Sequence, residues 1–533
     1  MYLITVYNLY LKQRMGGFMK IKICLLFILL FASTSFAKFW MPAIFNWGMV
    51  LQRDVPVKIW GVANPNEKID VWFNWKKTST IADNRGEWCV ILEPMEANFK
   101  PMAMTIFVND IPKKEIRDIL VGDVWILGGQ SNMEWRMPKT NDYKRALADV
   151  NKYEIRTFYQ PKMGDKILRR DNPPGSRWNT SIGDATLGSF SAVGYYFAEV
   201  LAQKENVPVG LVYTPVGGAK MITYIPESVM SKNEDYAKEL AKFKKAQQEY
   251  PYKKTLDKWN QLNKEYNDKV AKAKAKKQKP PRKPTFLHFN VIDGMPYPYN
   301  LMNGPAFLYN KMVAPLLMYT AKGVLWYQGC GDAAPDADTH FKPKFELLIE
   351  HWRSVAGNEK LPFYCVQLAS FGTRAHFASV RWAQQQTAKD DVNVGAVNII
   401  DTGDEKDIHP WDKHIVGKRL ANLVLQDVYK HKDVFGKCPD LKKIDYKGNS
   451  AEVLFNDFGR GLELKGNIRG FEVYSNGMWQ KAEVSFNNGK VVVKSTDNTA
   501  VSGVRYLWKN WAKPDVCIYN KDGLPANPFI NFK

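Results

Sequence analysis

The sequence lacks the residues and motifs that mark several common classes of protein. It has six cysteines in 533 residues, widely spaced and with no CxxC pair, so neither a disulfide framework nor a structural zinc site is expected. It also lacks HExxH, GxxxxGK[ST] and a GxGxxG turn after a strand, which excludes the usual metalloprotease, nucleotide and dinucleotide sites. No short period recurs, which excludes collagen and coiled coils. We therefore expect no metal and no cofactor.

The sequence has no apolar run near the ~20 residues that a membrane-spanning helix needs. Residues 19–37 read MKIKICLLFILLFASTSFA, in which two lysines precede an apolar core and a small-residue exit. This pattern predicts a secretory signal peptide over residues 1–37, cleaved after Ala37, with Met19 as the working start of an over-extended reading frame. We expect a secreted or periplasmic protein without a membrane anchor.

The formal net charge of +21 is concentrated in two segments. Residues 1–37 carry +4, and residues 231–285 carry +10 from 17 Lys and Arg against 7 Asp and Glu. No nucleic-acid recognition motif accompanies this charge, so nucleic acid is not an expected partner. No pattern in the sequence fixes an oligomeric state. The second segment predicts one or two exposed helices broken near Pro251, with either a solvated charged face or a surface for an acidic polymer.

The rhythm of apolar residues divides the remaining chain into three regions. Residues 38–120 alternate in short runs such as KIDVWFNW, which predicts an N-terminal β-sandwich domain. Residues 121–431 contain continuous apolar runs separated by amphipathic stretches, which predicts a doubly wound parallel α/β domain carrying 231–285 as an insert. Residues 432–533 return to the β rhythm and predict a C-terminal all-β domain. Chemistry in the α/β domain is expected at the carboxyl ends of its strands.

A serine stands directly after one of these strands, in VWILGGQSNMEW. Gly128 and Gly129 allow a turn that exposes the hydroxyl of Ser131, as a nucleophile requires. The same serine could instead be a turn or capping residue. The G-x-S-x-G elbow is absent because Met133 occupies its last position, which disfavours the common α/β-hydrolase fold.

A serine nucleophile needs a base, and the best-placed histidine is His409. It follows the apolar run VGAVNII into a loop, and Asp407 or Asp404 could orient its imidazole. An ordinary loop histidine is the alternative. Backbone N–H groups at Gly217-Gly218 and the side chain of Gln328 follow two other strands and are candidate oxyanion donors, unless they serve only in turns and hydrogen bonds.

The block GDVWILGGQSNMEW resembles the nucleophile block of the sialate O-acetylesterase family, within the SGNH/GDSL-like hydrolases. The resemblance continues in collinear order through MVLQRDVPVKIWGVA, FSAVGYYFAEVLAQKENVPVGLV, PLLMYTAKGVLWYQG, DIHPWDKHIVGKRLA and GLPANPF. It implies an SGNH-like α/β domain and an esterase that removes O-acetyl groups from a sugar. The implied site has Ser131 as nucleophile, His409 as base, Asp407 as its orienting group, Gly218 and Gln328 in the oxyanion hole, and Gln130, Asn132 and Gly217 as substrate-binding residues.

Two positions bear on how far this resemblance reaches. The family usually reads Trp-Tyr-Gln-Gly-Glu, whereas this chain has Cys330 in place of the acid. If that carboxylate orders the Gln328 loop, its loss weakens an oxyanion donor, and losing such a donor costs ~10²–10³ in rate. Lys220, close to the second glycine block, either favours an anionic substrate such as sialic acid or is a rim lysine.

We therefore predict a secreted serine esterase that resembles a sialate 9-O-acetylesterase and forms an acetyl-serine intermediate on an acetylated carbohydrate. One alternative is an acetylesterase for xylan or other hemicellulose. Another is a catalytically impaired carbohydrate-binding protein on the esterase scaffold, which Cys330 and the aromatic β domains would suit.

Overall fold

The computed structural model describes residues 39–180, 183–282, 284, 291–292, 295–296, 303–456, 459–487 and 489–533, and the predicted signal peptide lies outside these residues. The chain divides into two compact units. The first comprises the described part of Met1–Met41 with Trp60–Val90 and Thr105–Glu115, and the second comprises Pro42–Ile59, Ile91–Met104 and Ile116–Lys533. Within the described ranges no helix combines the length and the apolar character that a membrane crossing requires.

The first unit is built from β-strands. β3 (Lys68–Phe73) and β4 (Lys76–Ile81) form an antiparallel hairpin, and β2 (Val57–Val62) pairs with β5 (Glu87–Leu92). β2, β5, β6 (Asn98–Val108) and β7 (Ile111–Gly129) each run from one unit into the other. The domain boundary predicted at residue 120 therefore falls inside a continuous strand, and the separate β-sandwich stays a prediction.

The second unit contains a mostly parallel sheet. Its strands lie in the order β15 (Val394–Val397), β14 (Phe363–Val366), β13 (Gly323–Tyr327), β7, β10 (Val209–Tyr213), β8 (Ile155–Tyr159) and β9 (Arg177–Thr180). All neighbours are parallel except β8 and β9, and β1 (Val50–Gln52) adds a short parallel partner to β7. Every residue of β10 and β13 is buried, which explains their uninterrupted apolar sequence. The carboxyl ends of β7, β10, β13 and β15 consequently share one edge.

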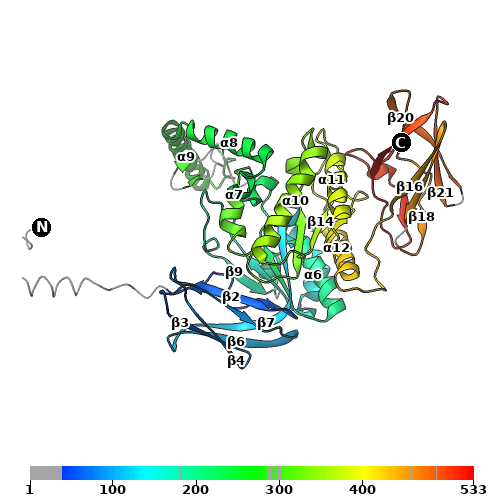
Figure 1. Ribbon diagram of the computed structural model, residues 1–533. Helices are drawn as coiled ribbons and strands as arrows, with labels where there is room; N and C mark the ends of the chain where they lie inside the picture. The colour runs from blue at the N-terminus through cyan, green and yellow to red at the C-terminus, as the bar shows by residue number, and fades with distance from the viewer. Residues whose placement is uncertain are drawn as a thin grey trace, which may run out of the picture. The chain divides into compact units, whose positions relative to one another are not determined.

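Helices cover both faces of this sheet (Figure 1). On one face α6 (Ala192–Glu205) packs against α12 (Lys413–Asp427), and the ring of Trp125 meets that of Phe197 edge-on at 5.2 Å. On the other face Trp326 stacks on Phe345 of α10 (Ala337–Ala356), which packs against α11 (Phe377–Asp390). Shorter helices are α3 (Ser131–Glu134), α4 (Tyr143–Asp149), α5 (Asp184–Leu187) and α7 (Glu227–Met230). The α/β class predicted for this region is confirmed, while its doubly wound arrangement and its bounds at 121 and 431 stay predictions.

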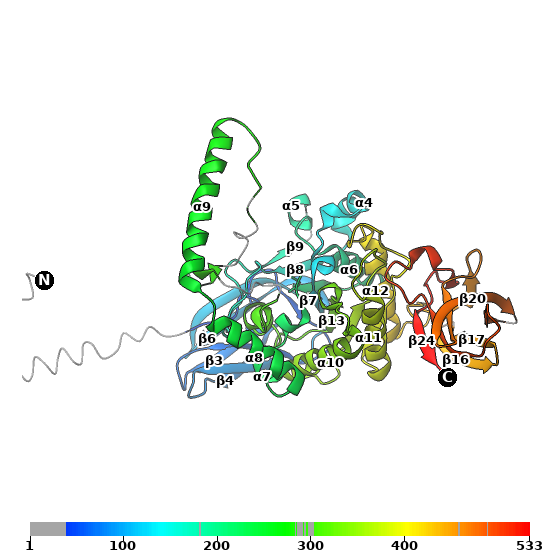
Figure 2. The same cartoon turned by 90° about the horizontal axis from the view of Figure 1, so that it is seen from above.

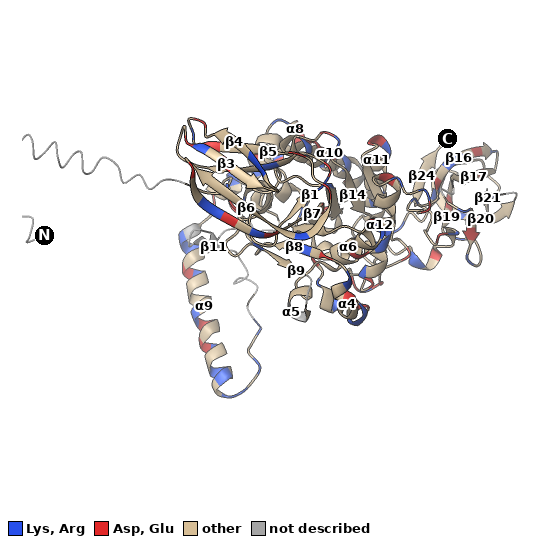
Figure 3. Cartoon of the chain, turned by 90° about the horizontal axis from the view of Figure 1, so that it is seen from below, with Lys and Arg blue, Asp and Glu red and all other residues tan. Residues whose placement is uncertain are grey.

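The Lys-rich insert forms two helices, α8 (Glu234–Gln248) and α9 (Tyr252–Ala275), which Pro251 separates (Figure 2). α8 is not fully exposed, because it buries Tyr236, Leu240 and Phe243. α9 carries both basic and acidic side chains (Figure 3), and the charged residues of its last turn, Lys272 and Lys274, are both basic. The described residues that follow include the short antiparallel strands β11 (Val291–Ile292) and β12 (Met295–Pro296).

The C-terminal region is all-β, as predicted. One sheet has the order β16 (Asp440–Lys447), β17 (Ser450–Asn456), β21 (Lys490–Ser495), β20 (Met478–Asn487), β19 (Phe471–Ser475), β22 (Val501–Tyr506) and β24 (Phe529–Phe532), and β18 (Leu462–Leu464) pairs with β23 (Ile518–Asn520). Alternate residues of β17 are buried, including Ala451 and Val453. One face of the sheet therefore supplies the core of this region.

Candidate active site

Ser131 lies at the carboxyl end of β7, where the chain turns sharply. Gly129 has a φ of +129°, and a Cβ built there would lie 2.3 Å from the carbonyl oxygen of Tyr327, so the turn requires glycine. The backbone N–H of Gln130 donates to the same carbonyl at 3.0 Å, which fixes the turn against β13. Ser131 then begins α3 as a half-buried residue whose hydroxyl faces the loop that follows β15.

The structure brings Ser131 and His409 together across 278 positions of sequence. Nε2 of His409 lies 3.0 Å from Oγ of Ser131, and Nδ1 lies 3.2 Å from Oδ1 of Asp407. The same carboxylate oxygen accepts the backbone N–H of His409 at 2.9 Å, and the other accepts the indole N–H of Trp411 at 3.2 Å. Asp404 instead accepts the backbone N–H groups of residues 406 and 407. Of the two aspartates that the sequence left open, Asp407 is therefore the one beside the imidazole.

The imidazole is also held from its face. The ring of Trp135 stacks on that of His409 with centroids 4.9 Å apart and planes 26° from parallel. Burial lowers the pKa of His409, and the positive charge of Lys413 lowers it further, while Asp407 opposes both. The backbone N–H of His409 lowers the pKa of Asp407, so that side chain is a carboxylate at neutral pH.

The second predicted block, Gly217-Gly218, follows β10 and lies next to the serine. A Cβ built on Gly217 would lie 3.6 Å from Cβ of Ser131. The N–H of Gly217 donates to Oε2 of Glu134 at 2.5 Å, and the other oxygen of Glu134 pairs with Lys162. Among the described residues no hydrogen-bond acceptor is found for the N–H of Ser131 or of Gly218. These two backbone donors are therefore available to a bound oxygen.

Gln328 differs from its prediction. It is fully buried, and its amide nitrogen donates to the carbonyl of Ala219 at 3.2 Å and to the carboxylate of Asp332. Both amide hydrogens are thus used within the protein, so the expectation that Gln328 donates directly to an oxyanion does not match this arrangement. Instead its side chain ties β13 to the loop that carries Gly218.

The carboxylate of Asp332 was not singled out from the sequence. Besides Gln328, it accepts the backbone N–H of Met221 at 2.9 Å. An acid is therefore still present to order the Gln328 loop, although Cys330 occupies the family's acidic position. The surroundings of the Cys330 thiol desolvate it and raise its pKa to about 12, so it is not a thiolate at neutral pH.

Gln130 and Asn132 also differ from prediction, because their polar atoms bind the protein. Oε1 of Gln130 accepts the N–H groups of Gly329 and Gly331 at 3.2 and 3.3 Å. Asn132 donates to the carbonyl of Ile408 at 3.2 Å and accepts from Lys413 at 2.5 Å. Both side chains are buried, so they brace the turn around Ser131, and of the three predicted substrate contacts only Gly217 stays a prediction.

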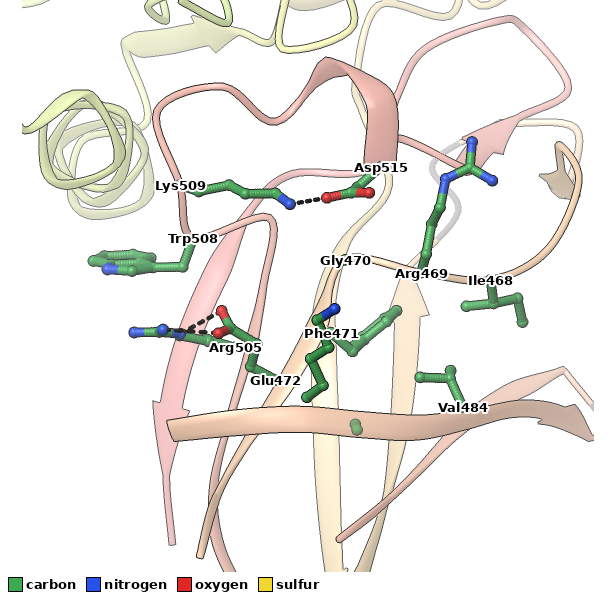
Figure 4. Close-up of a pocket in the computed structure, with 12 residues that line it drawn as sticks. Ile468, Arg469, Gly470, Phe471, Glu472, Val484, Arg505, Trp508, Lys509 and Asp515 are labelled. Atoms are coloured by element: carbon green, nitrogen blue, oxygen red, sulfur yellow. Dashed lines mark hydrogen bonds and ion pairs between the residues drawn. The ribbon is translucent and has the colours of Figure 1, made fainter. Parts of the chain in front are cut away.

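No group of three or more His, Cys, Asp or Glu side chains with metal-binding geometry occurs in the described part of the chain. The five described cysteines are free. A cavity of about 460 Å³ lies elsewhere, in the C-terminal β region (Figure 4). None of the residues that line it belongs to the loops around Ser131.

Comparison with known proteins bears directly on this site. The family model for sialic acid-specific acetylesterases, a family of carbohydrate esterases, matches residues 121–256 and 299–426. These ranges contain Ser131, Gly218 and His409, whereas most of α9 lies outside them. The chain belongs to this family.

Relatives match the esterase over most of its length. Sialate O-acetylesterase of Mus musculus is 25% identical, with 90% of this chain and 92% of the relative covered, and that of Homo sapiens is 24% identical, with 91% of each covered. A crystal structure of a carbohydrate acetylesterase from Xanthomonas citri superposes with a TM-score of 0.76 at 28% identity, covering 93% of this chain and 99% of that one. The esterase is a carboxylic ester hydrolase.

Proposed function

We propose that the chain is a serine esterase that removes O-acetyl groups from sugars, with O-acetylated sialic acid as its substrate. The observation that carries the mechanism is the 3.0 Å separation between Oγ of Ser131 and Nε2 of His409. At this distance the imidazole can take the hydroxyl proton as the oxygen attacks the acetyl carbonyl. The contact between Asp407 and Nδ1 leaves Nε2 as the proton acceptor.

The reaction then proceeds in two steps. Oγ of Ser131 bonds to the acetyl carbon, the bond from that carbon to the sugar oxygen breaks, and His409 passes the proton to this oxygen, so that the sugar leaves as a free hydroxyl and an acetyl-serine remains. Water, deprotonated by the same imidazole, attacks this ester, and the imidazole returns that proton to Oγ of Ser131 as acetate leaves, which restores the free serine. In both tetrahedral intermediates the oxyanion accepts from the N–H groups of Ser131 and Gly218, which have no acceptor among the described residues.

Two features support an anionic sugar. Lys220 follows the Gly217-Gly218 turn and is exposed, and Lys139, also exposed, has its ammonium 5.0 Å from the ring of Trp135, which stacks on His409. Cations at this rim favour a substrate that carries a carboxylate. The names of the mammalian relatives point to the same substrate.

The test is hydrolysis of an aryl acetate and of a panel of acetylated glycans by the wild type and by Ser131→Ala. We expect the variant to lose turnover on every ester, and the wild type to prefer O-acetylated sialic acid over acetylated xylan. Turnover that survives the substitution would refute the mechanism. A wild type that binds glycans without hydrolysing esters would support the impaired binding protein instead, and a preference for xylan would support the hemicellulose alternative.

We also propose that the esterase is exported, because residues 19–37 have the pattern of a signal peptide. Expression of the full chain in a bacterial host with an export pathway should yield a mature protein beginning at Lys38. Intact-mass measurement of the protein from the periplasm or medium tests this, and an uncleaved chain retained in the cytosol would contradict it.

A further inference from the structure

Lys413, the first residue of α12, is completely buried directly beside the serine turn. Its ammonium lies 2.5 Å from Oδ1 of Asn132, the residue that follows Ser131. The same ammonium lies 5.3 Å from the ring centroid of Trp135 and 5.7 Å from that of Tyr327. A buried cation in this position is costly to the fold unless its environment stabilises it.

The surroundings of Lys413 supply little negative charge. Within the described residues no carboxylate lies within 4.0 Å of the ammonium. The groups that face it are the amide of Asn132 from α3, the rings of Trp135 and Tyr327, the neutral thiol of Cys330, and the more distant carboxylates of Asp407 and Asp412. Burial lowers the pKa of Lys413 to about 7, so the charge is partly lost at neutral pH and is retained at mildly acidic pH.

The contact with Asn132 connects two parts of the active site. Asn132 accepts from Lys413 through one side-chain atom and donates through the other to the carbonyl of Ile408, at 3.2 Å. Ile408 immediately precedes His409 in the chain. Lys413 and Asn132 therefore join the turn that carries the nucleophile to the loop that carries the base.

The charge of Lys413 also acts on the base. His409 faces Ser131, Asp407, Lys413 and, at longer range, Lys139. After burial, the positive charge of Lys413 is the largest influence that favours the neutral imidazole. Only the neutral imidazole can accept the proton of Ser131.

We infer that Lys413 is a positioning residue of the esterase, which holds the Ser131 turn against the His409 loop through Asn132 and presents a buried positive charge to the active site. The inference rests on the proposed roles of Ser131 and His409. It assigns two separable effects to one side chain, a mechanical one through the hydrogen bond and an electrostatic one through the charge.

The experiment compares Lys413→Met, which keeps the length and removes the charge, with Lys413→Arg, which keeps the charge. The readout is the pH profile of kcat/KM on an aryl acetate. For Lys413→Met we expect a plateau lowered about tenfold and an acid limb moved by about one unit to higher pH, because the imidazole now protonates more readily. For Lys413→Arg we expect the limb to stay where the wild type has it.

Asn132→Ala is the matched control for the mechanical effect, because it removes the link to Ile408 and leaves the ammonium in place. It should lower the plateau without moving the acid limb upward. Thermal unfolding checks that each variant is folded.

An acid limb that does not move in Lys413→Met would overturn the electrostatic role. Acid limbs that are equal in Lys413→Met and Lys413→Arg but differ from the wild type would overturn it as well. Activity that survives in Ser131→Ala would instead refute the proposed function itself, so the two failures are distinguishable.

Discussion

Charged and hydrogen-bonding groups lie both around Ser131 and in the cavity of the C-terminal β region. The two places differ in whether these groups already have partners within the protein. In the cavity the guanidinium of Arg505 forms two hydrogen bonds with Glu472, at 2.8 and 3.0 Å, and Lys509 pairs with Asp515 (Figure 4). At the rim the backbone donors of Ser131 and Gly218 have no acceptor in the described chain, and Lys413 has no carboxylate partner.

This difference indicates where chemistry is possible. A hydrogen-bond donor whose partner is already in place has little to offer a transition state, whereas an unpaired, fixed donor can stabilise charge as it develops. In the cavity, the charged groups of Arg505, Glu472, Lys509 and Asp515 already have partners within the protein. Around Ser131, by contrast, the two oriented backbone donors of Ser131 and Gly218 have no acceptor among the described residues.

The largest expected effect comes from breaking the contact between Ser131 and His409. Ser131→Ala and His409→Ala should each lower kcat/KM on an aryl acetate by about 10⁴-fold or more, and the double variant should be no worse than either single one. The reason is that the two side chains act as one unit, so removing either abolishes the attack. Additive losses, measured against the uncatalysed rate, would show that they act separately.

The next largest effect is expected when Asp407 is replaced. Asp407→Ala should lower kcat by about 10²-fold, because the imidazole loses the group that orients it. The carboxylate raises the pKa of His409, so its removal should also move the acid limb of kcat/KM to lower pH, opposite to the shift expected for Lys413→Met. Asp404→Ala is the matched control and should retain the wild-type limb. A limb that moves upward in Asp407→Ala would contradict this assignment.

A smaller effect tests whether the departure at Cys330 matters. Because Asp332 holds the amide of Gln328, Asp332→Asn should lower kcat about tenfold by loosening the loop that carries Gly218. Cys330→Ala should change kcat by less than about twofold, since its neutral thiol anchors none of these groups. The opposite ranking would show that the position of the family's acid, and not Asp332, orders the loop.

The sequence predicts which loops surround the active site, but it does not predict which way the side chains of these loops point. Ser131 and His409 were predictable because each follows a buried strand, and the ends of parallel strands share an edge. The partners of Gln328, Gln130 and Asn132 were not, because they lie in loops that only the folded chain brings close. A side-chain amide has the same letter in a sequence whether it faces a substrate or a carbonyl.

Two further features escaped the sequence for related reasons. Lys413 looks like an ordinary charged residue at the start of a helix, and nothing local indicates that its side chain is buried. The predicted boundary at residue 120 lies where the apolar rhythm of the sequence changes, but β7 continues through this point as a single strand whose two ends differ in burial. Residues 113–118 of this strand alternate between exposed and covered, and its last eleven residues are all buried. A change of burial is therefore not the same as a change of domain.

The smallest expected effect concerns the paired charges of the cavity. Arg505→Ala breaks the pair with Glu472 and removes a guanidinium that lies 4.5 Å from the ring centroid of Trp479. Because the pair is partly exposed, we expect unfolding to become easier by only about 1 kcal/mol, measured by urea denaturation. Activity on an aryl acetate should stay within about twofold of the wild type, since distant sites act independently. A larger loss of activity with unchanged stability would mean that the cavity takes part in catalysis, and that paired charges are a poor guide to where the chemistry lies.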